Sequence, residues 1–171
     1  MADHFRTMAF LIDTERLSLR LRTKDDAECS LALLREHEGG TTLSIADVEQ
    51  RMVEQNERAR LDGFGLLGVR RRYESSPIGY CGVIMSRGTF EEPEIAYEIL
   101  PQFRGHGYAT EAAGAVVEAA FATGRERLWA TVDTWNTPSF RVLEKNGFHA
   151  DHNGCGERGE FVWMVRNAEK L

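Results

Sequence analysis

Two glycines lie in the stretch of the chain whose residue types and spacing most favour ligand chemistry. Gly105 and Gly107 follow an apolar run, 94–100, that is typical of a strand, and precede an alanine-rich run that is typical of a long buried helix. Glycine has no Cβ, so the main chain can adopt conformations closed to other residues and can come close to a ligand. The first amides of a helix lack intrahelical partners and lie at the positive end of its dipole. The spacing therefore predicts an anion site, suited above all to phosphate.

Two familiar phosphate-binding loops do not match the chain. A Walker A loop needs Gly-x-x-x-x-Gly-Lys-Ser/Thr, which occurs nowhere in the sequence. A Rossmann turn needs glycine or alanine at its third position, where this chain has Thr110. Together with the short chain, this argues against a dinucleotide-binding oxidoreductase. A Gly-x-Gly pair alone is also compatible with a turn that binds nothing.

The longer pattern resembles the GCN5-related N-acetyltransferase (GNAT) superfamily. It consists of Gln102-x-x-Gly105-x-Gly107-Tyr108-Ala109, the apolar run 128–132, and residues 136–148, in the order and at the spacing of the superfamily. Within the superfamily the chain is most similar to the ribosomal-protein N-acetyltransferases of the RimJ/RimL type, whose opening strand is similar to residues 14–20. The resemblance is tightest over residues 94–148 and looser over 14–93.

Composition and charge limit the class of protein. The 171 residues are 42% hydrophobic and 28% charged, as in globular proteins, and the net charge of -6 disfavours nucleic acid or an acidic membrane as a partner. No apolar run has the length of a transmembrane helix, and residues 1–6 do not resemble a signal peptide. Three cysteines without Cys-x-x-Cys spacing fit a reducing compartment. A cytoplasmic protein is therefore predicted.

Hydrophobic periodicity predicts a mixed α/β fold in one domain, 1–171, with its core over about 14–166. Strands are expected over 16–22, 64–69, 78–84, 94–100, 128–133 and 160–165, and helices over 25–37, 44–61, an alanine-rich stretch ending near Gly124, and 138–146. The resemblance implies the GNAT fold, a mixed, mostly antiparallel, twisted sheet. That sheet would have about six to seven strands, flanked by about four helices, with splayed central strands.

The resemblance also implies where acetyl-coenzyme A binds. The pyrophosphate would lie on the turn formed by Arg104, Gly105, His106, Gly107, Tyr108 and Ala109. The strands that carry Ile99 and Val132 would splay apart, and the pantetheine arm would pair with them as an extra strand would, with Ile99 and Leu100 as contacts. Arg141 and Lys145, four residues apart on one helix face, would border the adenosine 3'-phosphate, although most such charges are only solvated.

Two residues, Asn136 and Ser139, are catalytic candidates by the same resemblance, and Glu98 is a third candidate by its position in the chain. Asn136 would reach the pantetheine amide or the acceptor amine, and the alternative is a turn residue before a helix. Many superfamily members place a tyrosine four residues after the Ser139 position, but this chain has Leu143 there. The ribosomal-protein branch has a serine at position 139, so Ser139 would supply the hydroxyl facing the leaving thiolate. A serine that bonds the start of the helix is the competing interpretation.

A base is also needed, because an amine must lose a proton as it attacks a thioester. Several relatives use a glutamate in the second splayed strand, where this chain has Thr131. Glu98, in the central strand just before the turn, is the candidate, and an uninvolved rim carboxylate is the alternative. Glu157 and Glu160 are fallbacks, and proton loss to water needs none of them.

These patterns predict an acetyl-CoA-dependent N-acetyltransferase that works by direct attack in a ternary complex. The acceptor would be a primary amine, such as a protein N-terminus, and the acidic net charge favours cationic acceptors. A small-molecule acetyltransferase for polyamines, amino acids or antibiotics and a non-catalytic acyl-CoA-binding module stay open. The sequence also leaves open the shapes of the acceptor-side loops, 38–44 and 150–160, and whether the chain forms a homodimer. His149-x-x-His152-x-x-Cys155 lacks a fourth ligand, so no metal is expected.

Overall fold

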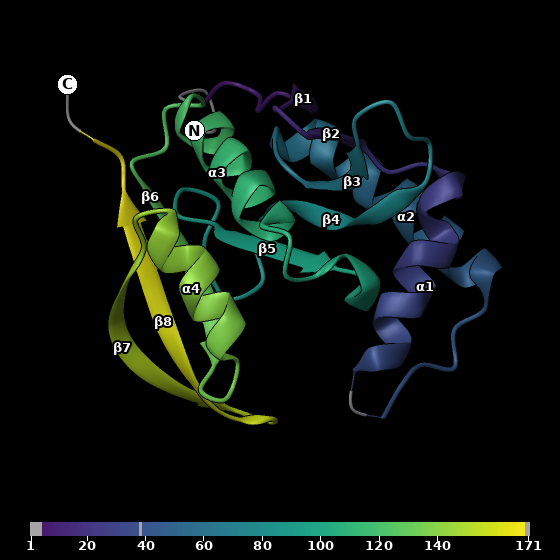
Figure 1. Cartoon of the computed structure of the whole chain (residues 1–171). Helices are drawn as coiled ribbons and strands as arrows, with labels where there is room; N and C mark the ends of the chain where they lie inside the picture. The colour runs from purple at the N-terminus through teal and green to yellow at the C-terminus, as the bar shows by residue number, and fades with distance from the viewer. Residues whose placement is uncertain (1–4, 38, 170–171) are drawn as a thin grey trace.

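The computed structural model describes residues 5–37 and 39–169. Glu38 and most of residues 1–6, which the sequence analysis compared with a signal peptide, lie outside the described residues. Within these residues one eight-stranded sheet carries four α-helices (Figure 1). The strands are β1 Leu11–Asp13, β2 Leu17–Leu21, β3 Leu66–Arg71, β4 Pro77–Ile84, β5 Glu94–Ile99, β6 Arg127–Asp133, β7 His149–Gly156 and β8 Gly159–Asn167. The helices are α1 Ala27–Glu36, α2 Ile45–Asp62, α3 Tyr108–Phe121 and α4 Thr137–Lys145, with 3-10 turns at Lys24–Asp26 and Pro101–Phe103.

The sheet has two antiparallel halves that meet at one parallel junction. β1 to β5 form the first half, and β6, β8 and β7 form the second. β5 and β6 pair only at Glu94 and Trp129, next to a hydrogen bond from the Trp129 N–H to the Pro93 carbonyl (3.0 Å). Beyond this pair no further residues of β5 and β6 pair with each other in the described part of the chain. The predicted splay of the central strands is therefore confirmed, and we call the space between them the fork.

One face of the sheet is covered by α3. Its alanine-rich sequence brings the helix axis close to the strands, because small side chains leave little between the two main chains. The buried side chains of α3 are Ala112, Ala113, Val116, Val117 and Ala120. They pack on residues that alternate along the strands, such as Leu67, Val69 and Ile95, and α4 adds Leu143 to the same core. This packing fixes the start of α3 against β5.

The opposite face of the first half is covered by α1. Cys29 and Leu33 of α1 cluster with Leu100 and pack against Tyr80. Burial raises the pKa of the Cys29 thiol to about 11, with a smaller contribution from the nearby carboxylate of Asp26, so this thiol stays protonated and acts as a small apolar side chain. The two faces of the sheet thus have separate cores.

Two segments differ from the expected element list. The sheet has eight strands among the described residues, whereas six were expected from hydrophobic periodicity. The two strands that were not predicted are β1 and β7. β7 has the sequence HADHNGCG, which carries no alternation of apolar residues, and most of its side chains are exposed. Residues 150–160 therefore lie in the hairpin of β7 and β8, and the prediction of a loop there is wrong. Cys155 is exposed in β7.

The fold predicts a large effect of charge removal under α1. The Asp26 carboxylate accepts a hydrogen bond from the Arg70 guanidinium (2.9 Å), and both side chains are 2% exposed. Asp26→Asn leaves a buried cation without its counter-charge, so we expect the free energy of unfolding in urea to fall by about 3 kcal/mol. Asp25→Asn, at an exposed neighbouring site, is the matched control and should change little. Equal stability of the two variants would contradict this account.

Candidate active site

The glycine turn has the geometry of an open helix start. Gly105 and Gly107 adopt φ values of 79° and 80°, in the left-handed region, and Gly107 is the N-cap of α3. A Cβ added at Gly105 would meet no atom within 4 Å, so the main chain there borders free space. The turn therefore presents the first amides of a 14-residue helix to a space that an anion can enter.

Arg16, in the connection from β1 to β2, holds this turn in place. Its Nη1 donates to the His106 carbonyl (2.8 Å) and its Nε donates to Glu111 Oε2 (2.6 Å) in the first turn of α3. Glu111 Oε1 also accepts from the main-chain N–H of Arg16 (2.8 Å) and from the Thr14 hydroxyl (2.6 Å). The Arg16 guanidinium lies 4.8 Å from the centre of the Tyr108 ring. Sequence analysis missed this clamp, although an acidic residue in a first helical turn is a local hint.

Arg104 has a different place from the one expected of a phosphate ligand. Its Nε donates to the Ile99 carbonyl (2.7 Å) and its Nη2 to Glu36 Oε2 on α1 (2.6 Å). Its main-chain N–H donates to the Pro101 carbonyl (3.1 Å). The side chain thus ties the end of β5 to α1, and its amide is already used within the turn.

The main-chain groups of β5 that face the fork follow from its pairing with β4. The Leu100 N–H donates to the Ile78 carbonyl (2.9 Å), which places the main-chain groups of Leu100, and by alternation those of Glu98, on the β4 side. The groups of Tyr97 and Ile99 then point the other way, into the fork. Because β6 has diverged at this level, these groups have no sheet neighbour there. The arrangement can accept an extended, hydrogen-bonding ligand between the strands.

Asn136, Ser139 and Tyr97 meet at the fork. Asn136 is the N-cap of α4, and its side-chain oxygen accepts from the Ser139 N–H (3.3 Å). Since Asn136 caps this end, the Ser139 hydroxyl is not needed as the cap. The Tyr97 hydroxyl donates to the Ser139 carbonyl (3.2 Å) across the fork. Burial raises the pKa of the Tyr97 phenol, so it stays a neutral donor. Tyr97 was not among the predicted residues.

Glu98 lies on the other face of β5, towards α1. Its Oε2 accepts a hydrogen bond from the Tyr80 hydroxyl (3.1 Å) and lies 3.3 Å from His37 Nε2. The Glu98 side chain is 19% exposed and that of His37 is 45% exposed. Burial and the Glu98 carboxylate raise the pKa of Tyr80. Glu98 is thus a shielded carboxylate with a histidine between it and solvent, and not a fully exposed rim residue.

The remaining predicted residues are more dispersed. Leu100 is buried at the end of β5, whereas Arg141 and Lys145 are exposed on α4. Glu157 and Glu160 are exposed on the hairpin of β7 and β8. Among residues 5–37 and 39–169 no group of three or more histidine, cysteine, aspartate or glutamate side chains could hold a metal ion.

Comparisons with known proteins agree with this architecture. A family model described as the acetyltransferase (GNAT) domain matches residues 16–149. YoaA of Bacillus subtilis (strain 168), an uncharacterized N-acetyltransferase, is 30% identical over 148 residues, which cover 82% of this chain and 84% of YoaA. The chain therefore belongs to the GNAT acetyltransferase family, as the sequence resemblance predicted.

Two solved structures share the fold. The ribosomal-protein-S5-alanine acetyltransferase from Vibrio fischeri superposes with a TM-score of 0.76 at 18% identity, covering 93% of this chain and 97% of that one. Mycobacterium smegmatis RimJ, in complex with CoA-disulfide, superposes with a TM-score of 0.73 at 19% identity, covering 89% of this chain and 82% of that one.

No helix in the described part of the chain combines the length and apolar character needed to cross a lipid bilayer.

The turn geometry makes a substitution at Gly107 a test of anion binding. Gly107→Val introduces a branched side chain at φ 80°, and its Cβ would lie 3.3 Å from the Arg16 guanidinium. We expect the affinity for coenzyme A, measured by calorimetry, to fall about tenfold or more, because the turn must distort. Gly159→Val, at φ 102° with open space around it in the hairpin of β7 and β8, is the control for the conformational cost. Unchanged affinity in Gly107→Val would count against the turn as the site.

The clamp predicts a pH dependence of stability. Burial alone would raise the pKa of Glu111, but hydrogen bonds from Thr14 and Arg16 outweigh it and lower the pKa. Ionised Glu111 therefore stabilises the fold fully above its unfolded pKa of about 4.3, and this contribution is lost as the pH falls through the lower folded value. The stability difference between wild type and Glu111→Gln, measured in urea, should shrink in acid. Glu57→Gln, exposed on α2, should show no such trend. A difference that stays constant down to pH of about 3 would contradict this assignment.

Proposed function

We propose that this chain is a single-domain, acetyl-CoA-dependent N-acetyltransferase of the RimJ/RimL type that acetylates a primary amine such as a protein N-terminus. The observation that carries the proposal is the fork, which begins at the pair of Glu94 with Trp129 and widens toward the end of β5, after which the glycine turn follows. A long ligand with a phosphate group and an amide-containing arm fits this combination of helix start and free strand edge.

The residues of the turn would bind the pyrophosphate of coenzyme A. Amides from Gly105 to Ala109 are the donors, and Arg16 keeps them in register through the His106 carbonyl. The Arg104 side chain serves the fold here, since it is bonded to Ile99 and Glu36. Arg141 and Lys145 on α4 are exposed and free to contribute charge at the adenosine 3'-phosphate.

The fork would orient the acyl group. Bound acetyl-CoA supplies a thioester whose carbonyl carbon an amine can attack. The fork-facing main-chain N–H groups of Tyr97 and Ile99 would hold the arm, and an N–H on this edge would polarise the carbonyl. Holding both reactants in one site supplies much of the rate by itself.

Two side chains would move protons. Glu98 would accept the proton of the attacking amine, and His37, half-exposed and 3.3 Å away, gives that proton a route to solvent. Ser139 would donate from its hydroxyl to the departing sulfur on the opposite side of the fork. Asn136 and Tyr97 position Ser139 through its N–H and its carbonyl.

A thiol-release assay tests the function. Acetyl-CoA would be offered with short peptides that differ in their first residue, with polyamines, with amino acids and with aminoglycosides, and coenzyme A and NADH would be titrated directly. We expect coenzyme A to bind, NADH not to bind, and thiol release with at least one amine. Coenzyme A binding without turnover on any acceptor would favour a non-catalytic acyl-CoA-binding module, and binding of NADH alone would overturn the proposal.

Two substitutions separate chemistry from binding. Ser139→Ala and Glu98→Gln should each lower kcat about 100-fold, because each removes one proton-transfer group, while the affinity for coenzyme A changes little. Thr137→Ala, at an exposed position in the first turn of α4, is the matched control for Ser139. If Ser139→Ala weakens coenzyme A and leaves kcat intact, Ser139 is a binding contact and not an acid. If Glu98→Gln leaves kcat intact, water takes the proton.

A further inference from the structure

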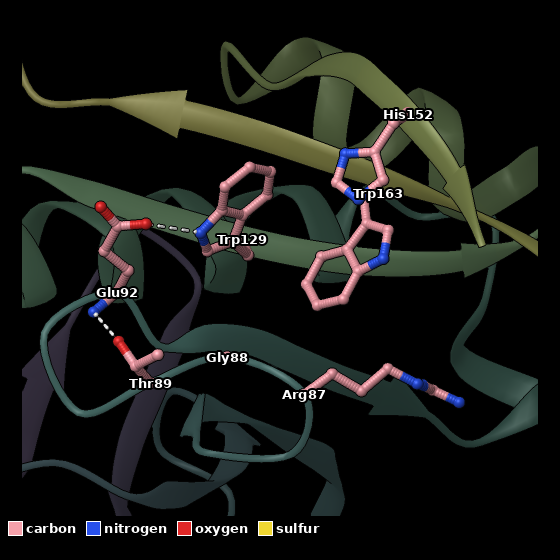
Figure 2. Close-up of a pocket in the computed structure, with 7 residues that line it drawn as sticks. All are labelled: Arg87, Gly88, Thr89, Glu92, Trp129, His152 and Trp163. Carbon is pink, nitrogen blue, oxygen red and sulfur yellow. Dashed lines mark hydrogen bonds between the residues drawn. The ribbon is translucent and has the colours of Figure 1, made fainter.

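A pocket of about 140 Å³ opens beside the closed end of the fork, and the proposed chemistry does not use it (Figure 2). We call it the aromatic pocket. It is lined by Arg87, Gly88, Thr89, Glu92, Trp129, His152 and Trp163. These residues come from β6, β7, β8 and the connection between β4 and β5. A connection, a strand and a hairpin thus converge on one small space.

Two tryptophans form different sides of the aromatic pocket. The ring centres of Trp129 and Trp163 are 5.5 Å apart and their planes are at 83° to each other. His152 stacks on Trp163 with ring centres 5.5 Å apart and an angle of 21°. The faces of indole rings attract cations, and ammonium and guanidinium groups are the usual partners.

The charges around the aromatic pocket favour the same ligand. Glu92 accepts from Trp129 Nε1 (2.9 Å) and from Arg127 Nη1 (3.2 Å), and its side chain is 40% exposed. A carboxylate has about four acceptor positions, so it can accept further hydrogen bonds. The Arg87 guanidinium lies 4.4 Å from the Phe161 ring and points away from Glu92 in Figure 2.

An anion is a poor match for this arrangement. Arg127 is bonded to Glu92 and to Asn167, and Arg87 donates to the Thr131 hydroxyl (3.3 Å), so both guanidinium groups have partners. His152 Nδ1 lies 2.6 Å from the Asp151 carboxylate, which adds another negative group near the aromatic pocket. A neutral ligand would gain nothing from the charge of Glu92, whose carboxylate already pairs with Arg127.

The aromatic pocket lies on the sheet face that carries Glu98. The Thr131 hydroxyl donates to Glu94 Oε2 (3.0 Å), so these side chains share one face, and Trp129 is two residues from Thr131. By the same alternation Glu98 is on this face of β5. Trp129 pairs with Glu94, four residues before Glu98, which places the aromatic pocket about 13 Å along the strand from the proposed base.

We propose that the aromatic pocket binds a second ammonium group of the acceptor, one that is not acetylated. Trp129 and Trp163 would contact its charged head, and the Glu92 carboxylate would pair with it. The enzyme would then favour amines with two positive charges spaced to reach from Glu98 to this pocket. This inference rests on the proposed function for its role in catalysis, but binding in the aromatic pocket can be measured without turnover.

Choline and its neutral isostere 3,3-dimethylbutan-1-ol test the aromatic pocket directly. The chain has three tryptophans, so the indole N–H groups give three resonances in a nitrogen–proton correlation spectrum. At constant ionic strength, choline should shift the Trp129 and Trp163 resonances in a saturable way. The resonance of Trp135, which is 73% exposed and outside the pocket, is the internal control and should not move. The neutral alcohol should bind about tenfold more weakly.

Substitutions separate cation binding from apolar contact. Trp163→Leu keeps apolar volume but removes the π face, and should weaken choline about tenfold, whereas Trp163→Phe should retain most of the affinity. Glu92→Gln should also weaken choline. Equal binding of the neutral alcohol, or an absence of shifts, would overturn the proposal. Shifts that follow protein concentration and not choline would do the same, because they would assign this face to a second copy of the chain.

A kinetic comparison links the aromatic pocket to the acceptor. In the thiol-release assay, Trp163→Leu should raise KM about tenfold for the best dicationic amine and leave KM for a monoamine unchanged, with little change in kcat for either. An equal rise in KM for both amines would overturn the role in selecting dications. Saturable choline binding without turnover on any amine would contradict the proposed function and still support a cation-binding pocket.

Discussion

A single parallel pairing between β5 and β6 determines the geometry of the site. Each half of the sheet is antiparallel, and among the described residues the only strand pairing between the halves is that of Glu94 with Trp129. Strands in a twisted sheet stay together only while their main-chain groups pair. Because the pairing stops after one residue, the groups of Tyr97 and Ile99 face a gap. The fold has thus left main-chain N–H groups on this edge for a ligand to pair with, whereas the Ile99 carbonyl already accepts from Arg104.

The junction is reinforced by a buried carboxylate. Glu94 is 3% exposed and accepts hydrogen bonds from the main-chain N–H groups of Arg87 and Gly88. Its second oxygen accepts from the Thr131 hydroxyl on β6 (3.0 Å). The Glu94 side chain therefore bonds both the connection before β5 and β6, the other strand of the fork. Arg87 and Gly88 also line the aromatic pocket, so the fork and the proposed cation pocket share Glu94 as a support.

Local patterns in the sequence predicted the parts of the fold that depend on neighbouring residues. The helix expected over 44–61 is found as α2, with Ser44 as its N-cap, and Gly105 and Gly107 take the left-handed conformations that a tight turn before α3 needs. β7 was missed because its side chains are mostly exposed and therefore carry no hydrophobic period. The family assignment came from motif order over 94–148, not from any one residue.

Links between distant residues lay beyond sequence analysis. Arg16 and Glu111 are 95 positions apart, and Tyr97 and Ser139 are 42 apart. Neither pair leaves a local pattern, because the contact exists only after the strands and helices have packed. Arg104 shows the converse case, since its type and place suggested a phosphate ligand, whereas its side chain joins β5 to α1.

Hydrogen exchange of individual amides, measured with and without saturating coenzyme A, tests the fork most directly. The main-chain N–H groups of Tyr97 and Ile99 should exchange several-fold more slowly in the complex, because the bound arm pairs with them. The N–H groups of Glu98 and Leu100, already paired with β4, serve as controls and should change little. Saturated binding that leaves Tyr97 and Ile99 unprotected would show that coenzyme A binds elsewhere and would contradict the account.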